Sequence, residues 1–277
     1  MLSALRLTWR LTLFILFLVS IILVALALRI GDLFTASRID RTPVAHHSIQ
    51  ILCGLLGFRL NVRGSVAEGP VLFVSNHISW SDIPVLLACA PLRFLSKIEV
   101  SRWPVIGWLA GEAGTLYIKR GGGQSGSVRQ QIASVLAGGR SVLIFPEGTT
   151  TTGVSVLPFH GRLLAAAADA KCRIQPMTIG YRRNDLPDPV APFIGDDSFH
   201  SHLVRLLSKP ALEVEVILHP AIEPEAAQPT EALAQQLHNT VSSGLSQIHE
   251  PRRTSPSTPD EGDALGACAS LESRSGY

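Results

Sequence analysis

The stretch VLFVSNHISWSD, residues 71–82, joins an apolar run to a histidine, a hydroxyl-rich turn and a carboxylate. Its first five residues predict a strand covered on both faces, because such strands are almost continuously hydrophobic. Residues 81–90, which follow, predict a helix. His77 and Asp82 are therefore expected near the carboxyl end of a strand, the edge of an α/β sheet at which ligands bind.

Outward from this stretch, β-rich runs alternate with helical segments as far as residue 220. The other predicted strands are GTLYIKR (114–120), SVLIFP (141–146), IQPMTIGY (174–181) and LEVEVILH (212–219). The other predicted helices are 125–139, 161–171 and 230–250. This alternation predicts an α/β fold with a mostly parallel sheet covered by helices. Only residues 212–219 alternate cleanly between apolar and polar, which predicts an edge strand or one with a wet face.

The first 60 residues predict membrane attachment. Residues 11–28, LTLFILFLVSIILVALAL, carry no charge, and a helix of this length spans about 27 Å, close to the thickness of the hydrocarbon core. A cleaved signal peptide is the alternative, because residues 25–27 resemble a cleavage site; the length of the apolar stretch favours an uncleaved anchor. Residues 49–60 are too short to span, and predict either an interfacial helix or the first packing helix of the body.

The arginines that flank residues 11–28 give only a small asymmetry, from which the positive-inside rule places the body on the cytoplasmic side of the inner membrane. Residues 61–250 are then expected to form the folded domain. Residues 251–277 are rich in Ser, Pro, Gly and charge and predict a disordered tail, because such a segment buries too little apolar surface to fold.

Composition excludes several classes of protein. Hydrophobic residues make up 46% of the chain and charged residues 17%, a balance typical of membrane association. The formal charge is +2 and no long basic run occurs, so nucleic-acid binding is not expected. The four cysteines, which form no CxxC pair and lie apart from the histidines, predict reduced thiols and no metal site: Cys53, Cys89, Cys172 and Cys268.

Polar side chains follow three of the predicted strands. A neutral His77 accepts a proton from an alcohol when a carboxylate such as Asp82 holds its other ring nitrogen. On the residues alone, Ser81 or Asp82 merely capping the helix is an open alternative. Arg120 ends the second strand, and a guanidinium recognises phosphate or carboxylate with two hydrogen bonds.

The third segment, FPEGTTTTG (145–153), predicts a sharp turn whose N–H groups and hydroxyls face an anion, or else an ordinary surface turn. GGGQSG (121–126) fits a dinucleotide-binding loop, but three consecutive glycines satisfy that pattern easily, and a flexible loop is the better interpretation. No G-x-S-x-G elbow and no Walker A loop occurs, which excludes the usual serine-hydrolase and P-loop classes.

Together these segments resemble the glycerolipid acyltransferases typified by 1-acylglycerol-3-phosphate acyltransferase. The family's N-H-x4-D motif is matched by Asn76, His77 and Asp82; its second motif resembles residues 114–120; F-P-E-G-T-R-S is matched through residues 145–149; and its fourth motif resembles residues 174–177. Order and spacing agree across residues 70–180. The chain departs from the family at Thr150, where the family has arginine.

The resemblance implies acyl transfer from acyl-CoA or acyl-ACP to a lysophospholipid hydroxyl. His77 is the implied base and Asp82 its orienting acid, while the residues implied to bind the acceptor's head group are Arg120, Glu147, Gly148 and Thr149. No metal or redox cofactor is implied, and the partners are membrane lipids and the acyl carrier.

The leading acceptor is 1-acyl-sn-glycerol-3-phosphate, giving phosphatidic acid. Thr150 in place of arginine makes lyso-ornithine lipid an alternative acceptor. A catalytically silent, membrane-anchored lipid-binding protein is the alternative of a different class.

Overall fold

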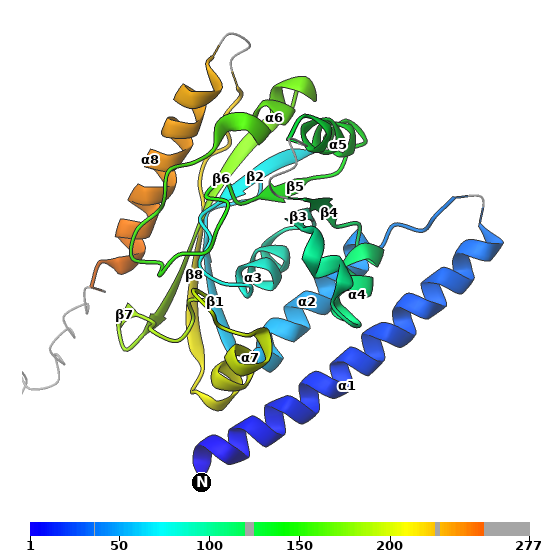
Figure 1. Ribbon diagram of the computed structural model, residues 1–277, viewed down its shortest axis with the longest axis vertical. Coiled ribbons are helices and arrows are strands. Elements are labelled where there is room, and N and C mark those ends of the chain that lie inside the picture. Colours follow the sequence, from blue (N-terminus) through cyan, green and yellow to red (C-terminus); the bar gives the residue numbers. More distant parts are fainter. Residues whose placement is uncertain (36, 120–124, 225–227, 252–277) are drawn as a thin grey trace, which may run out of the picture.

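A mixed, mostly parallel β-sheet forms the centre of the molecule, with helices on both faces (Figure 1). The computed structural model describes residues 1–35, 37–119, 125–224 and 228–251. Its strands are β1 (Phe58–Arg63), β2 (Val71–Ser75), β3 (Arg93–Lys97), β4 (Leu116–Ile118), β5 (Val142–Ile144), β6 (Arg173–Arg183), β7 (Leu186–Pro187) and β8 (Leu212–Leu218). Its α-helices are α1 (Leu2–Gly31), α2 (Thr42–Leu56), α3 (Asp82–Cys89), α4 (Ile106–Glu112), α5 (Ser125–Ala137), α6 (Ala165–Asp169), α7 (Phe199–Ser208) and α8 (Thr230–His249).

The strands follow the order β1-β8-β6-β2-β5-β3-β4, with β7 paired to β6. The central strand β2 pairs in parallel with both β5 and β6. β8 is antiparallel to β6 and parallel to β1, and the short β7 is also antiparallel to β6, so β1, β7 and β8 run against the other strands. The predicted α/β fold with a mostly parallel sheet is confirmed.

The side chains of β2 explain its unbroken apolar sequence. Val71 and Phe73 point into one apolar layer, which α2, α3 and α7 cover, whereas Leu72 and Val74 point into a second layer under α5, α6 and α8. All four side chains are fully buried. A strand covered on both faces has no wet side, and its sequence therefore does not alternate.

The prediction that residues 212–219 form an edge strand or a strand with a wet face was wrong. β8 lies inside the sheet between β1 and β6, and all but one of its residues are buried. The polar Glu215 is only 4% exposed, because Asn61 Nδ2 on β1 donates to its Oε2 at 2.8 Å. Glu215 is therefore polar because of a buried contact with β1, a strand that the sequence analysis did not predict.

Residues 49–60 do not form a single helix. α2 ends at Leu56, and Gly57 adopts a positive φ of 80° that only glycine takes up without strain. The chain then enters β1, the outer edge of the sheet. Cys53 and Leu56 are buried in the apolar layer, so the end of α2 is a packing helix of the body.

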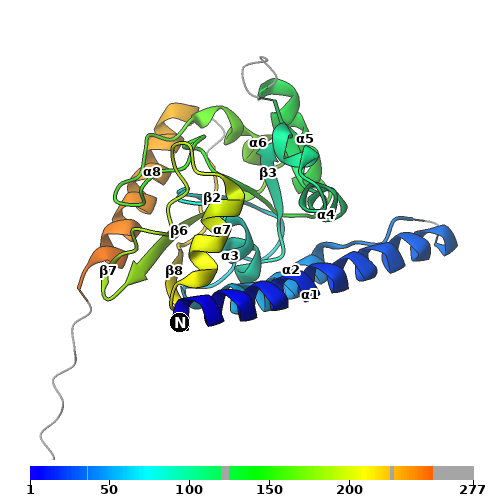
Figure 2. The ribbon, with the colours of Figure 1, turned by 60° about the horizontal axis from the view of Figure 1, so that its bottom comes forward.

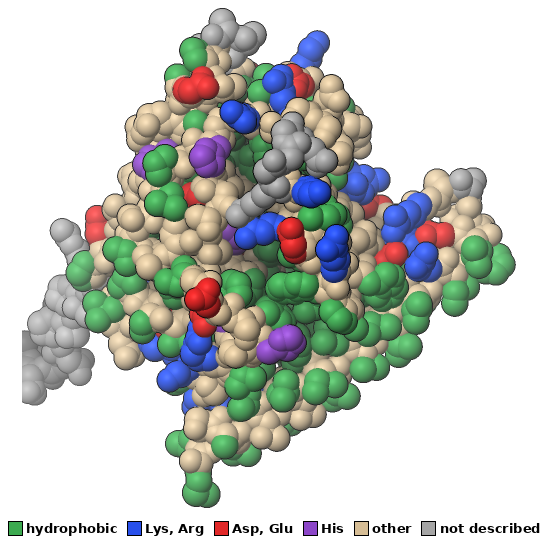
Figure 3. All heavy atoms as spheres, viewed as in Figure 1, with side chains coloured by type: hydrophobic (Ala, Val, Ile, Leu, Met, Phe, Trp, Pro, Cys, Tyr) green, Lys and Arg blue, Asp and Glu red, His purple; other side chains and the backbone are tan. Residues whose placement is uncertain are grey.

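The N-terminal helix α1 is longer than the predicted span 11–28 and lies along the body (Figures 1 and 2). Near its start, Arg6 and Arg10 donate to the carbonyls of Ser208 and Lys209 at the C-terminal end of α7. The helical segment Leu2–Phe34 is long enough and apolar enough to cross a membrane. Figure 3 shows hydrophobic side chains along this helix, and those most exposed on it include Leu5, Trp9, Leu16, Leu23 and Ile30. α1 is therefore a candidate membrane anchor.

Candidate active site

His77 and Asp82 form a hydrogen-bonded pair where β2 leads into α3. His77 Nδ1 lies 2.7 Å from Asp82 Oδ2. The carboxylate accepts only, so Nδ1 carries the proton and Nε2 keeps its lone pair. The His77 side chain is 18% exposed, whereas Asp82 is fully buried. In the described part of the chain Nε2 has no hydrogen-bond partner, so it is available to take a proton from a bound alcohol.

The Asp82 carboxylate accepts hydrogen bonds from four groups. Besides His77, Oδ2 accepts from the backbone N–H groups of Ile78 at 2.6 Å and Ser79 at 2.9 Å. Oδ1 accepts from the Tyr181 hydroxyl at 2.7 Å. The two N–H groups precede α3, and Ser81 gives α3 no side-chain cap. The helix-cap alternative is therefore wrong: the carboxylate fixes the loop that carries His77.

Glu147 holds the backbone of His77 from the turn after the neighbouring strand β5. Its Oε1 accepts from the His77 N–H at 2.6 Å, and its Oε2 accepts from the Leu157 N–H at 2.7 Å. Burial raises the pKa of the Glu147 carboxyl above its ordinary value, although both N–H donors oppose this shift. Both oxygens thus have backbone partners, and the side chain is only 4% exposed. Its predicted contact with the head group stays a prediction.

The turn after β5 places an aromatic ring on the histidine. The Gly148 N–H donates to the Phe145 carbonyl at 3.1 Å, and Gly148 adopts a φ of 69°. The Phe145 ring stacks on His77 with 4.0 Å between centroids and 13° between planes. This contact, together with the hydrogen bond to Asp82, fixes the orientation of the imidazole.

Two threonines follow Gly148 in the turn after β5, and they have different surroundings. Thr149 is exposed beside Gly148 in the same turn. Thr150 Oγ1 donates to the Phe193 carbonyl at 2.5 Å, and Phe193 N–H donates to the Ile78 carbonyl. Thr150, at the position where the family has arginine, is therefore hydrogen-bonded through its hydroxyl to the loop that carries Phe193.

Arg120 and most of the glycine-rich stretch 121–126 lie outside the described residues, as do Cys268 and nearly all of the predicted tail 251–277. The strand that leads to Arg120, β4, is separated from β5 by β3. Of the three predicted polar strand ends, those of β2 and β5 are adjacent, and the third lies further along the sheet.

Asn76 connects this edge to β6. Its Nδ2 donates to the Ile179 carbonyl and its Oδ1 accepts from the Ile179 N–H, both at 2.9 Å. The side-chain amide thereby extends the hydrogen bonding between β2 and β6 one residue beyond the end of β2. The start of the His77 loop is in this way attached to β6.

The sequence analysis did not identify His202 of α7, because no sequence motif includes this histidine. This histidine is fully buried, and its Nδ1 accepts from Trp80 Nε1 at 2.9 Å. Its Nε2 donates to the carbonyls of Val190 and Pro192. Burial lowers the pKa of His202, and a neutral ring is what these contacts require. Trp80 of the quoted stretch is thus anchored to α7.

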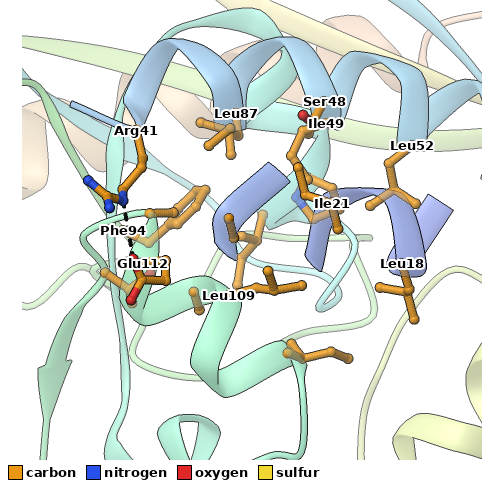
Figure 4. A pocket seen from close by; sticks show the side chains of 18 of the residues that line it. Leu18, Ile21, Arg41, Ser48, Ile49, Leu52, Leu87, Phe94, Leu109 and Glu112 are labelled. Atoms are coloured by element: carbon orange, nitrogen blue, oxygen red, sulfur yellow. Dashed lines mark hydrogen bonds and ion pairs between the residues drawn. The ribbon is translucent and has the colours of Figure 1, made fainter. Parts of the chain in front are cut away.

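An apolar cavity of about 290 Å³ lies between α1 and the body (Figure 4). Side chains of α1, α2, α3 and α4 line it, and Trp80 is among its lining residues. Ile21 and Leu18 come from α1, while the Arg41–Glu112 ion pair, with N–O distance 3.1 Å, lies at one side. The cavity therefore adjoins the loop that carries His77 and offers space for an extended hydrocarbon group.

The chain is similar in sequence to known acyltransferases. The family model described as Acyltransferase matches residues 59–180. A lyso-ornithine lipid O-acyltransferase of Pseudomonas aeruginosa is 48% identical over 203 residues, covering 73% of this chain and 78% of the relative. A 1-acyl-sn-glycerol-3-phosphate acyltransferase of Neisseria gonorrhoeae is 30% identical over 164 residues, covering 58% and 64%.

A solved structure has the same fold. The 1-acyl-sn-glycerophosphate acyltransferase PlsC of Thermotoga maritima superposes with a TM-score of 0.66 at 19% identity, over 89% of this chain and 95% of that one. The match extends well beyond residues 59–180, and therefore includes elements on either side of the motifs.

The contacts of His202 predict that acid destabilises the fold. Because its pKa is lowered on folding, the unfolded chain binds a proton before the folded chain does. Its contribution to the free energy of unfolding is full above the unfolded-state pKa of about 6.5 and is lost as the pH falls toward the folded-state value. Denaturant unfolding between pH 7.5 and pH 5 should show this loss.

In His202→Phe the free energy of unfolding should fall less between pH 7.5 and pH 5 than in the wild type. At pH 7.5 the variant should be the less stable of the two. The exposed neighbour provides a matched control, since His200→Phe should keep the wild-type slope. An unchanged slope in His202→Phe would contradict this assignment.

Proposed function

Because the chain belongs to the glycerolipid acyltransferase family and is an acyltransferase of the lysophospholipid type, we propose that it acylates the hydroxyl of lyso-ornithine lipid. The observation that supports the chemistry is the free Nε2 of His77, with Nδ1 held by the buried Asp82 carboxylate. This acceptor replaces 1-acyl-sn-glycerol-3-phosphate, which the motifs alone favoured.

The reaction follows from the site. His77 Nε2 takes the proton of the acceptor hydroxyl as its oxygen attacks the carbonyl carbon of the thioester. The C–O bond forms and the C–S bond breaks, and the imidazolium returns its proton to the departing thiolate. General-base assistance of this kind contributes about 10²–10⁴-fold. Base, hydroxyl and thioester complete the step, so we include no metal or redox cofactor in the proposal.

The acceptor is inferred from charge and from similarity. Lysophosphatidate presents a phosphate monoester, for which a guanidinium is the matched partner. At the position of the family's arginine this chain has Thr150, whose hydroxyl donates to Phe193. The ornithine head group carries a carboxylate and an ammonium, and its binding therefore needs less positive charge on the protein than a phosphate monoester does. Greater similarity to the lyso-ornithine lipid O-acyltransferase supports the same choice.

The donor and the membrane complete the proposal. We assign acyl-CoA or acyl-ACP as the thioester, and the apolar cavity beside Trp80 as the place of an acyl chain. α1 attaches the protein to the membrane that holds the acceptor. The described cysteines are free thiols, which supports a body on the cytoplasmic side of the inner membrane.

His77→Ala should lower acyl transfer to lyso-ornithine lipid by about 10²–10⁴-fold, because the general base is lost. Release of free thiol from acyl-CoA and from acyl-ACP, with lyso-ornithine lipid or lysophosphatidate as acceptor, measures both the mechanism and the substrate. His47→Ala on the exposed side of α2 is the control and should remain active. Wild-type protein that releases no thiol with any acceptor would point to a silent lipid-binding protein.

Thr150→Arg should move the specificity toward lysophosphatidate. A charge-assisted hydrogen bond is worth about 1.5–3 kcal/mol, so the ratio of the two kcat/KM values should change by about 10- to 100-fold. Thr152→Arg adds the same charge to an exposed neighbour and serves as the control. Equal changes for the two acceptors, or equal effects of the two variants, would refute the assignment of Thr150.

Ser48→Phe should shorten the preferred acyl chain, because Ser48 lines the apolar cavity and a benzyl group would fill part of it (Figure 4). Competition between acyl donors of different length measures the shift. His47→Phe places the same group on the exposed side of α2 and should leave the preference unchanged. An unaltered preference in Ser48→Phe would show that the acyl chain lies elsewhere.

A further inference from the structure

We propose that Tyr181 and Ser81 are positioning residues that extend the His77–Asp82 pair into a four-member hydrogen-bonded chain, and that the Tyr181 hydroxyl sets the turnover rate by holding Asp82. This inference rests on the proposed function for its kinetic consequence, but its geometry does not. The chain runs from Ser81 through Tyr181 and Asp82 to His77, with successive heavy-atom distances of 2.9, 2.7 and 2.7 Å.

The direction of each hydrogen bond follows from the groups. Asp82 only accepts, so the single proton of Tyr181 is directed at Oδ1. Ser81 Oγ must then donate to Tyr181 Oη. Burial and the nearby Asp82 carboxylate raise the pKa of Tyr181 well above its ordinary value, so the phenol keeps this proton and stays a donor.

Tyr181 is held in place by the fold. It lies on β6, is 3% exposed, and its ring meets that of Phe58 edge-on at 6.5 Å between centroids. Its backbone pairs with Val214 of β8. A ring fixed in this way brings its hydroxyl to Asp82 at no further cost in side-chain freedom.

The contact matters because Asp82 is fully buried. A charge in such a place requires a hydrogen bond at each oxygen. Oδ2 is shared among His77 and two backbone N–H groups, whereas Oδ1 accepts from Tyr181, its one hydrogen bond within the described residues. Without the Tyr181 hydroxyl, Oδ1 loses this hydrogen bond, and the carboxylate is held through Oδ2 alone, which permits a less favourable angle to His77.

Tyr181→Phe tests the proposal, because the ring remains and only the hydroxyl is removed. We expect kcat to fall by about 10- to 100-fold, the effect of one hydrogen bond to a charged group, with little change in KM. Ser81→Ala should cost less, since it acts through Tyr181. The matched control is Thr178→Val, which removes another buried hydroxyl from β6, one that contacts His219 and Val241 on the other side of the sheet. Thr178→Val should lose stability without losing kcat.

A double-mutant cycle with Asp82→Asn separates positioning from general structural damage. With the carboxylate gone, the second change Tyr181→Phe should alter the residual turnover by no more than about 3-fold, since the two act as one unit. An equal loss in both backgrounds, or an unchanged kcat in Tyr181→Phe, would overturn the proposal.

A substrate-free measurement distinguishes this inference from the proposed function. In protein labelled with ¹⁵N-histidine, the nitrogen shifts of His77 report which ring nitrogen carries the proton. Tyr181→Phe should change them and Thr178→Val should not. Such a change in a protein that transfers no acyl group would uphold the four-member chain and reject the function; identical spectra for wild type and Tyr181→Phe would overturn the chain.

Discussion

The buried Asp82 carboxylate is the point on which the rest of the site depends. A charged group with no exposure is stable only where donors surround it, and here they come from the His77 loop and from β6. The same contacts that stabilise the charge also fix the loop and the tautomer of His77. The hydrogen bonds that stabilise the buried carboxylate are therefore the same ones that orient His77.

A second carboxylate, Glu147, has a different task. It binds the backbone of His77 from the turn after β5, while Phe145 of the same turn stacks on the imidazole. Asp82 thus orients the ring from its Nδ1 side, and the β5 turn fixes its plane and main chain. Segments that follow the two adjacent strands β2 and β5 together fix the imidazole, as the proposed proton transfer requires, because such a transfer depends on short, aligned contacts.

The apolar part of the molecule serves the same site. α1 leaves many large hydrophobic side chains exposed on one side and lines the apolar cavity with others. Trp80 lies both in the His77 loop and in the wall of this cavity, and its indole N–H donates to His202 of α7. The candidate membrane anchor α1 therefore also forms a wall of the space proposed for the acyl chain.

The sequence by itself determined the α/β class, five strands, the apolar N-terminal helix and the position of His77, Asp82 and Glu147 at strand ends, because these depend on local periodicity and on motif order. The tertiary structure decided what lies beside them. Tyr181 is 99 positions from Asp82 and His202 is 122 from Trp80, and β8 is interior only because β1 pairs with it. Such contacts depend on strand order, and hydrophobic pattern specifies which face of a strand is buried without specifying its neighbour.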